Sequence, residues 1–287
     1  LYFSTSMLDV QLRSVRESMP TLKQASVMVI GGAEDKINAR QILTTFFQRS
    51  GGTDSVIGVI PCASREPSII GDRYRKIFTE MGAQRIEVLD IRSRNEVGEA
   101  RWFEILDACT GIFLTGGDQL RLCSLMADTQ LMNTIRQKAQ LGGIALAGTS
   151  AGAAVMGERM IAGGGSGESP NRALVDLSDG LGIIHEILVD QHFHNRNRMA
   201  RLMSAVAACP DKLGIGIDED TCAHFEGAES FCVLGKGTIT IVDPGDLSHT
   251  NHADAKSTDP LSIHNLKVHV LSPGDRYNFR ERDIITP

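Results

Sequence analysis

The alternation of short apolar runs with helical segments is the feature of this sequence that most constrains its fold. Apolar runs at residues 25–32, 55–61, 85–91 and 111–114 predict buried strands. Between the first two runs, Ile42, Leu43, Phe46 and Phe47 follow one another at helical spacing. Because alternating strands and helices form parallel sheets with helices on both faces, we expect an α/β protein with a mostly parallel central sheet.

The last third of the chain has a different pattern. After about residue 208, short alternating runs separated by glycine predict antiparallel strands and hairpins, with a final strand within residues 266–279. No internal repeat or linker divides the sequence, so we expect one domain over residues 7–287. Residues 1–6, LYFSTS, resemble the remnant of a cleavable tag, and Met7 is then the natural start.

Composition narrows the class of protein. The formal net charge of −6 disfavours a nucleic-acid partner, which usually requires a basic face. No apolar stretch approaches the roughly 20 residues that span a bilayer, and the segment after Met7 lacks the apolar core of a signal peptide. The six cysteines include no C-x-x-C pair, which favours reduced thiols. We expect a cytoplasmic protein with no membrane contact.

Three polar clusters follow predicted strands directly. They are TGGDQ at residues 115–119, GTSAG at 148–152 and DQHFHNRNRMAR at 190–201. Because parallel strands present their carboxyl ends at one edge of a sheet, we expect the three clusters to meet there and form a ligand site.

Ser150, at the centre of GTSAG, has two interpretations. It is a nucleophile on a strand-to-helix elbow, where the backbone N–H of Ala151 points at a developing oxyanion and Gly148 and Gly152 permit close packing. Alternatively, Ser150 only caps the helix that begins near Ala151.

A serine nucleophile needs a base, and His192 is the best placed of the eight histidines. An acid that orients this imidazole is available among Asp218, Glu219 and Asp220, and the residues alone leave the choice open. The pattern His-Phe-His does not favour a metal, since alternate residues of a strand point to opposite faces. We expect no metal.

Further candidate site residues accompany the serine, the histidine and the acid. The N–H of Gly117 is a second oxyanion donor, and the Gln119 amide is suited to hold a substrate backbone. A helix expected from Asn195 would place Arg198 and Arg201 off its buried stripe, where they could bind a substrate carboxylate. The buried stripe comprises Met199, Leu202, Met203 and Val206.

The glycine-rich runs GGAEDK and AGGGSGES match neither the dinucleotide fingerprint nor the phosphate-binding loop. We expect no nucleotide and no other cofactor.

Taken in chain order, the motifs FLTGGDQ, GTSAGAAVMG, DQHFHNRNRMARL and GIGIDEDTCA resemble those of the cyanophycinases. That group belongs to a serine peptidase family that also contains the α-aspartyl dipeptidases. The resemblance runs from VIGGAEDK near the start to HVLSPGDRYNF near the end.

This resemblance implies a three-layer α/β/α sandwich like that of class I glutamine amidotransferases, with C-terminal antiparallel strands. It also implies a homodimer. The implied substrate is cyanophycin, a poly-aspartate with arginine on each side-chain carboxyl, and the implied product is the β-Asp-Arg dipeptide.

Residue by residue, the resemblance implies Ser150 as nucleophile, His192 as base and Glu219 as the acid. It implies that five further residues line the substrate site: Gln119, Asp190, Gln191, Arg198 and Arg201. The alternatives are an α-aspartyl dipeptidase of the same fold and a non-catalytic binding module in which Ser150 is only a cap.

Overall fold

A computed structural model describes residues 25–167 and 169–286. The predictions for residues 1–6 and for Met7 lie outside the described residues. Within the described ranges, no helix is both long and apolar enough to cross a membrane. All six cysteines lie in these ranges and are free thiols.

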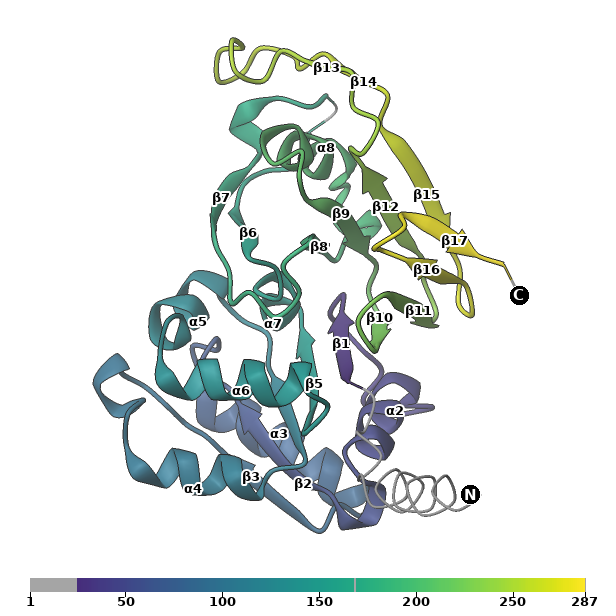
Figure 1. The fold of residues 1–287 in the computed structure, drawn as a ribbon. Coiled ribbons are helices and arrows are strands. Elements are labelled where there is room, and N and C mark those ends of the chain that lie inside the picture. Colours follow the sequence, from purple (N-terminus) through teal and green to yellow (C-terminus); the bar gives the residue numbers. More distant parts are fainter. Residues whose placement is uncertain (1–24, 168, 287) are drawn as a thin grey trace, which may run out of the picture.

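The largest sheet has nine strands in the order β17-β16-β11-β10-β1-β5-β4-β2-β3 (Figure 1). Its parallel half comprises β1 (Ser26–Ile30), β2 (Val56–Ile60), β3 (Arg85–Val88), β4 (Gly111–Leu114) and β5 (Ala145–Thr149). Its antiparallel half comprises β10 (Thr221–Glu226), β11 (Ser230–Gly235), β16 (Arg276–Asn278) and β17 (Asp283–Ile285).

Helices cover both faces of the parallel half. On one face lie α2 (Gln41–Arg49) and α3 (Pro67–Glu80). On the other lie α4 (Ala100–Ala108), α5 (Gln119–Met126), α6 (Gln130–Gln140) and the short α7 (Ala151–Ala154). Successive side chains of β1 alternate between the two cores, Met28 in one and Val27 in the other. The predicted α/β architecture with a parallel sheet between helices is confirmed.

A second sheet of four strands has the order β15-β12-β9-β8, with bounds Lys267–Leu271, Ile239–Asp243, Leu213–Ile217 and Ile187–Gln191 respectively. Helix α8 (Met199–Ala208) packs on it through Leu202 and Val206. Strand β8 therefore lies in a different sheet from β5, whereas the sequence predicts that both end at one sheet edge. The carboxyl ends of the two strands nevertheless approach each other (Figure 1).

Short elements complete the fold. Two small ladders pair β6 (Arg159–Gly163) with β7 (Asp176–Asp179) and β13 (His249–Thr250) with β14 (Ile263–His264). Four 3₁₀ turns occupy Gly52–Asp54, Arg94–Glu96, Arg172–Leu174 and His194–Arg196. The single late strand expected within residues 266–279 is in fact two strands, β15 and β16, which belong to different sheets.

Candidate active site

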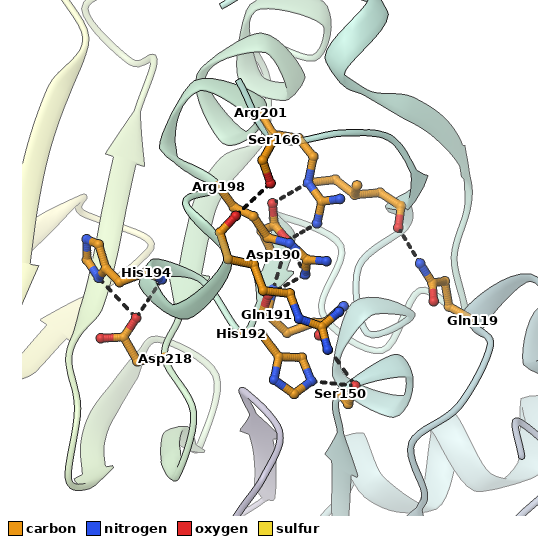
Figure 2. Close-up of polar contacts among 12 residues, drawn as sticks. Gln119, Ser150, Ser166, Asp190, Gln191, His192, His194, Arg198, Arg201 and Asp218 are labelled. Carbon is orange, nitrogen blue, oxygen red and sulfur yellow. Dashed lines mark hydrogen bonds and ion pairs between the residues drawn. The ribbon is translucent and has the colours of Figure 1, made fainter. Parts of the chain in front are cut away.

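Ser150 occupies a sharp turn between β5 and α7. Its backbone angles are φ 54° and ψ −109°, outside the regions that a non-glycine residue normally adopts. Its side chain caps no backbone N–H in the described chain, and its Oγ instead lies 3.0 Å from Nε2 of His192 (Figure 2). The helix-cap interpretation is therefore wrong, and the geometry is that of a hydroxyl facing a base.

The turn depends on glycine. A Cβ on Gly148 would lie 2.2 Å from the carbonyl oxygen of Gly152, and a Cβ on Gly152 would lie 2.5 Å from that of Leu114. The backbone conformation of Ser150 is sparsely populated and costs about 1–3 kcal/mol. The packing around Ser150 must therefore hold this residue in place.

His192 follows β8 and also has a positive φ, 49°. Its N–H donates to the carbonyl of Gly31 at 2.8 Å, and its Nδ1 lies 2.6 Å from Oε1 of Glu219. Burial lowers the pKa of His192 below its ordinary 6.5, the Glu219 carboxylate opposes this shift, and the nearby Arg196 adds to it. The imidazole is thus neutral at neutral pH, as a general base must be.

The structure distinguishes the three acids that the sequence leaves open. Asp218 accepts hydrogen bonds from His194 and from Thr238. Burial raises the pKa of Asp218, but these hydrogen bonds outweigh burial and lower it. Asp220 accepts the N–H of Asp35 at 2.8 Å. Glu219 is the one of these three acids that contacts the His192 imidazole.

The loop containing Gly117 lies beside Ser150. A Cβ on the neighbouring Gly116 would lie 3.3 Å from Cβ of Ser150 and 3.7 Å from its Oγ. Gly117 is exposed, has φ +146°, and would place a Cβ 2.2 Å from the carbonyl oxygen of Ala63. Only glycine fits this position. Ala151, on the other side, begins α7 directly after Ser150.

Asp190 and Arg201 form a buried ion pair rather than two open ligand groups. Arg201 Nε donates to Oδ2 of Asp190 at 2.8 Å, its Nη2 donates to Oδ1, and the Arg201 side chain is only 5% exposed. The prediction that Arg201 lies off the buried face is therefore wrong. The expected helix start is wrong as well, because Asn197 (φ 50°) separates a 3₁₀ turn from α8, which begins at Met199.

Arg198 and Gln191 lie between this ion pair and Ser150 (Figure 2). Arg198 Nη1 donates to Oδ1 of Asp190 at 3.3 Å and to the carbonyl of Gln191. Burial lowers the pKa of Arg198 to about 10, so its guanidinium stays charged at neutral pH. Gln191 Oε1 lies 3.4 Å from Ser150 Oγ.

Gln119 stands at the start of α5. Its Nε2 donates to the carbonyls of Ile161 and Ala162, at 3.2 and 2.8 Å. The amide nitrogen is thus used to hold β6.

One group of side chains in the described residues has the composition of a metal site, and it lies outside the site around Ser150. Its members, His224, Glu226 and Cys232, bring ligand atoms within 4.8 Å of one another. The Glu226 carboxylate is already paired with Arg49 and Arg276, so a cation there would compete with two guanidinium groups.

Known proteins resemble this chain over most of its length. Residues 27–233 match peptidase family S51. A cyanophycinase from Trichormus variabilis is 57% identical over 280 residues, which are 98% of this chain and 94% of that protein. A cyanophycinase from Geminocystis herdmanii is 61% identical over 255 residues, 89% and 94% of the two chains. The chain belongs to peptidase family S51.

A solved structure supports the fold. The crystal structure of a peptidase from an acI-B1 Actinobacterium superposes with a TM-score of 0.65 at 20% identity, covering 90% of this chain and 98% of that one. The resemblance predicted from the motifs is confirmed, and this S51 member is a serine peptidase.

Proposed function

We propose that this S51 peptidase hydrolyses the α-peptide bonds of cyanophycin and releases β-Asp-Arg dipeptides. The observation that carries the proposal is the hydrogen-bonded series from Ser150 Oγ to His192 Nε2 and from His192 Nδ1 to Glu219. Relatives that are 57–61% identical over nine-tenths of the chain are named cyanophycinases, which supports the substrate.

In the acylation step, Ser150 Oγ attacks the carbonyl carbon of an aspartate in the polymer backbone. His192 Nε2 takes the hydroxyl proton, and Glu219 stabilises the imidazolium and fixes the tautomer with a proton on Nδ1. We assign the N–H groups of Gly117 and Ala151 as the donors to the oxygen that gains negative charge. The C–N bond then breaks, and His192 returns the proton to the leaving amine.

In deacylation, water takes the place of the Ser150 hydroxyl as the attacking group, and Ser150 Oγ becomes the leaving group. A water molecule gives a proton to His192 and attacks the acyl carbon, and the ester bond to Ser150 breaks as His192 returns the proton to Oγ. No metal or cofactor enters either step. His192 serves as base and acid in turn, which requires that it be neutral when each attack begins.

Recognition of the branched substrate needs both signs of charge, since each unit carries a carboxylate and a guanidinium. Arg198 remains charged next to Gln191, and we assign it to the substrate carboxylate. Gln191, next to Ser150 Oγ, and the carbonyl oxygen of Gln119 are the amide groups assigned to the polymer backbone.

Asp190 and Arg201 belong to the same substrate site, but their burial indicates an indirect role. Each already satisfies the other, and Asp190 Oδ1 also accepts the N–H of Gln191 at 2.9 Å. We assign the pair to holding Gln191 and Arg198 in place. A single-domain peptidase over residues 7–287, a cytoplasmic location and a homodimer complete the proposal.

Purified cyanophycin tests this function directly. The proposal predicts accumulation of a product with the mass of one aspartate joined to one arginine, and no such product with Ser150→Ala. Cleavage of short α-Asp-X peptides without action on cyanophycin would select the dipeptidase alternative. Binding of cyanophycin without any cleavage would select the binding module.

A further inference from the structure

The three loops that carry the Ser150, His192 and Glu219 side chains are all attached to one short segment, the end of β1 and the residues after it. Three consecutive carbonyl groups of this segment accept backbone N–H groups from the three loops. The pairs are Ile30 with Ser150 at 3.0 Å, Gly31 with His192 at 2.8 Å, and Gly32 with Asp220 at 2.9 Å. The relative position of nucleophile, base and acid is therefore set against this segment.

Close packing reinforces the arrangement. Gly32 has φ +99°, and a Cβ there would lie 2.4 Å from the His192 ring. Asp35 donates its N–H to Asp220, and its own carboxylate accepts four backbone N–H groups of residues 37–40. These contacts fix His192 and the loop that carries Glu219, and they do not involve the side chain of Glu34.

Glu34 is a buried acid, 3% exposed, at the back of the nucleophile turn. Its Oε2 accepts the hydroxyl of Thr149 at 2.6 Å, and its Oε1 accepts the hydroxyl of Tyr74 and lies 3.0 Å from Lys36 Nζ. Burying a carboxylate is unfavourable unless it is paired and hydrogen-bonded, and here both oxygens are engaged. The buried carboxylate of Glu34 thus makes a direct hydrogen bond with the residue that precedes Ser150.

Thr149 immediately precedes Ser150, whose backbone is held in an unfavourable conformation. Thr149 is the last residue of β5 and is itself buried. Fixing its side chain restricts the backbone just before the turn, and the turn sets where Ser150 Oγ lies relative to His192 Nε2.

We propose that Glu34 is a positioning residue that holds Thr149, and through it keeps the Ser150 hydroxyl aligned with His192. The inference rests on the proposed role of Ser150 as nucleophile. It gives a function to the GGAEDK run, which matches no phosphate-binding pattern.

The test measures how fast a fluorophosphonate labels Ser150, together with kcat and KM on cyanophycin. Glu34→Gln keeps the size of the side chain and replaces one acceptor oxygen with an amide donor. Because a displacement of about 1 Å at a reacting group costs on the order of a hundredfold, we expect labelling and kcat to fall by about tenfold to a hundredfold. KM should change by less than about twofold, since uniform substrate binding is not altered.

Thr149→Val is the second variant, because it removes only one buried hydroxyl and disturbs the fold least. It should slow labelling as Glu34→Gln does, and Thr149→Ser, which keeps the hydroxyl, should be labelled faster than Thr149→Val. The double variant should be no slower than the worse single one, since both interrupt the same contact. Glu80→Gln, a surface acid paired with Arg40, is the matched control with wild-type kinetics.

The outcomes separate the two proposals. If the wild-type protein is not labelled at Ser150, the proposed function fails. If the wild type is labelled and either Glu34→Gln or Thr149→Val reacts at the wild-type rate, the positioning role of Glu34 is overturned. Additive losses in the double variant would also overturn it.

Discussion

The part of the chain that the structure describes contains two serine–histidine–glutamate groups, one at each end of β1, and of these two only one has the geometry of a catalyst. Both serines lie about 3 Å from the Nε2 atom of their histidine. The first group is Ser150, His192 and Glu219, with distances of 3.0 and 2.6 Å. The second is Ser26, His224 and Glu226, with distances of 2.9 and 4.0 Å.

The difference lies in the backbone and in the acid. Ser26 is an ordinary residue of β1, 5% exposed, whereas Ser150 stands on a strained turn that presents its hydroxyl. The Glu226 carboxylate lies closer to Arg49 and Arg276 than to the imidazole of His224. A serine next to a histidine is therefore insufficient, and the turn that carries Ser150 and the hydrogen bond between His192 and Glu219 make the distinction.

The largest contrast is expected from removing each hydroxyl. Ser150→Ala should lower the release of dipeptide from cyanophycin by at least about 10³-fold, because no other group provides the nucleophile. Ser26→Ala should cleave cyanophycin like the wild type. Loss of activity in Ser26→Ala with a native melting temperature would show that the second group takes part in the reaction.

The acids should differ in the same sense. Glu219→Gln should lower kcat on the order of 10³-fold or more, since an amide can stabilise the wrong imidazole tautomer and cannot neutralise the imidazolium. Glu226→Gln should leave kcat unchanged. Steady-state kinetics on cyanophycin measures both, and equal losses in the two variants would break the distinction.

The buried histidine of the second group should appear in the pH dependence of stability. Burial lowers the pKa of His224 to about 4 from an ordinary 6.5. The unfolded chain therefore binds the proton more readily, and the contribution to stability is present above pH 6.5 and is lost as the pH falls toward 4. The loss is at most about 3 kcal/mol. Urea unfolding at several pH values should show that the free energy of unfolding of His224→Gln depends less steeply on pH than that of the wild type. Identical slopes would contradict a lowered pKa of His224.

The smallest effect concerns the base of the first group. The acidic limb of the kcat/KM profile should lie below pH 6.5, because burial lowers the pKa of His192. Arg196 adds to that lowering, so Arg196→Gln should raise the pKa and move the limb to higher pH. A shift to lower pH, or none, would show that the limb reports another group.

How far the sequence predicts this molecule depends on the range of the interactions involved. The strands of the parallel sheet and the elbow at Ser150 follow local patterns, namely apolar runs and glycines at fixed offsets, and these were predicted. The choice of Glu219 follows from its neighbours, because His194 and Asp35 engage Asp218 and Asp220, and no local pattern indicates these contacts.

The errors have the same origin. Arg201 is buried because Asp190, eleven residues earlier, pairs with it, and spacing along a helix treats an arginine as exposed. The sequence patterns also do not single out Glu34, which stands in a glycine-rich polar run typical of an exposed loop although its side chain is buried. The one available signal is position, since GGAEDK directly follows the strand that lies beside β5.

Mass-spectrometric mapping of the residue modified by a fluorophosphonate tests the central claim most directly, because it compares every serine of the chain in one sample. The account predicts a single adduct on the peptide that contains Ser150, and no adduct in His192→Ala. An unmodified Ser150 in the native protein, or an adduct that forms equally well without the imidazole of His192, would contradict it.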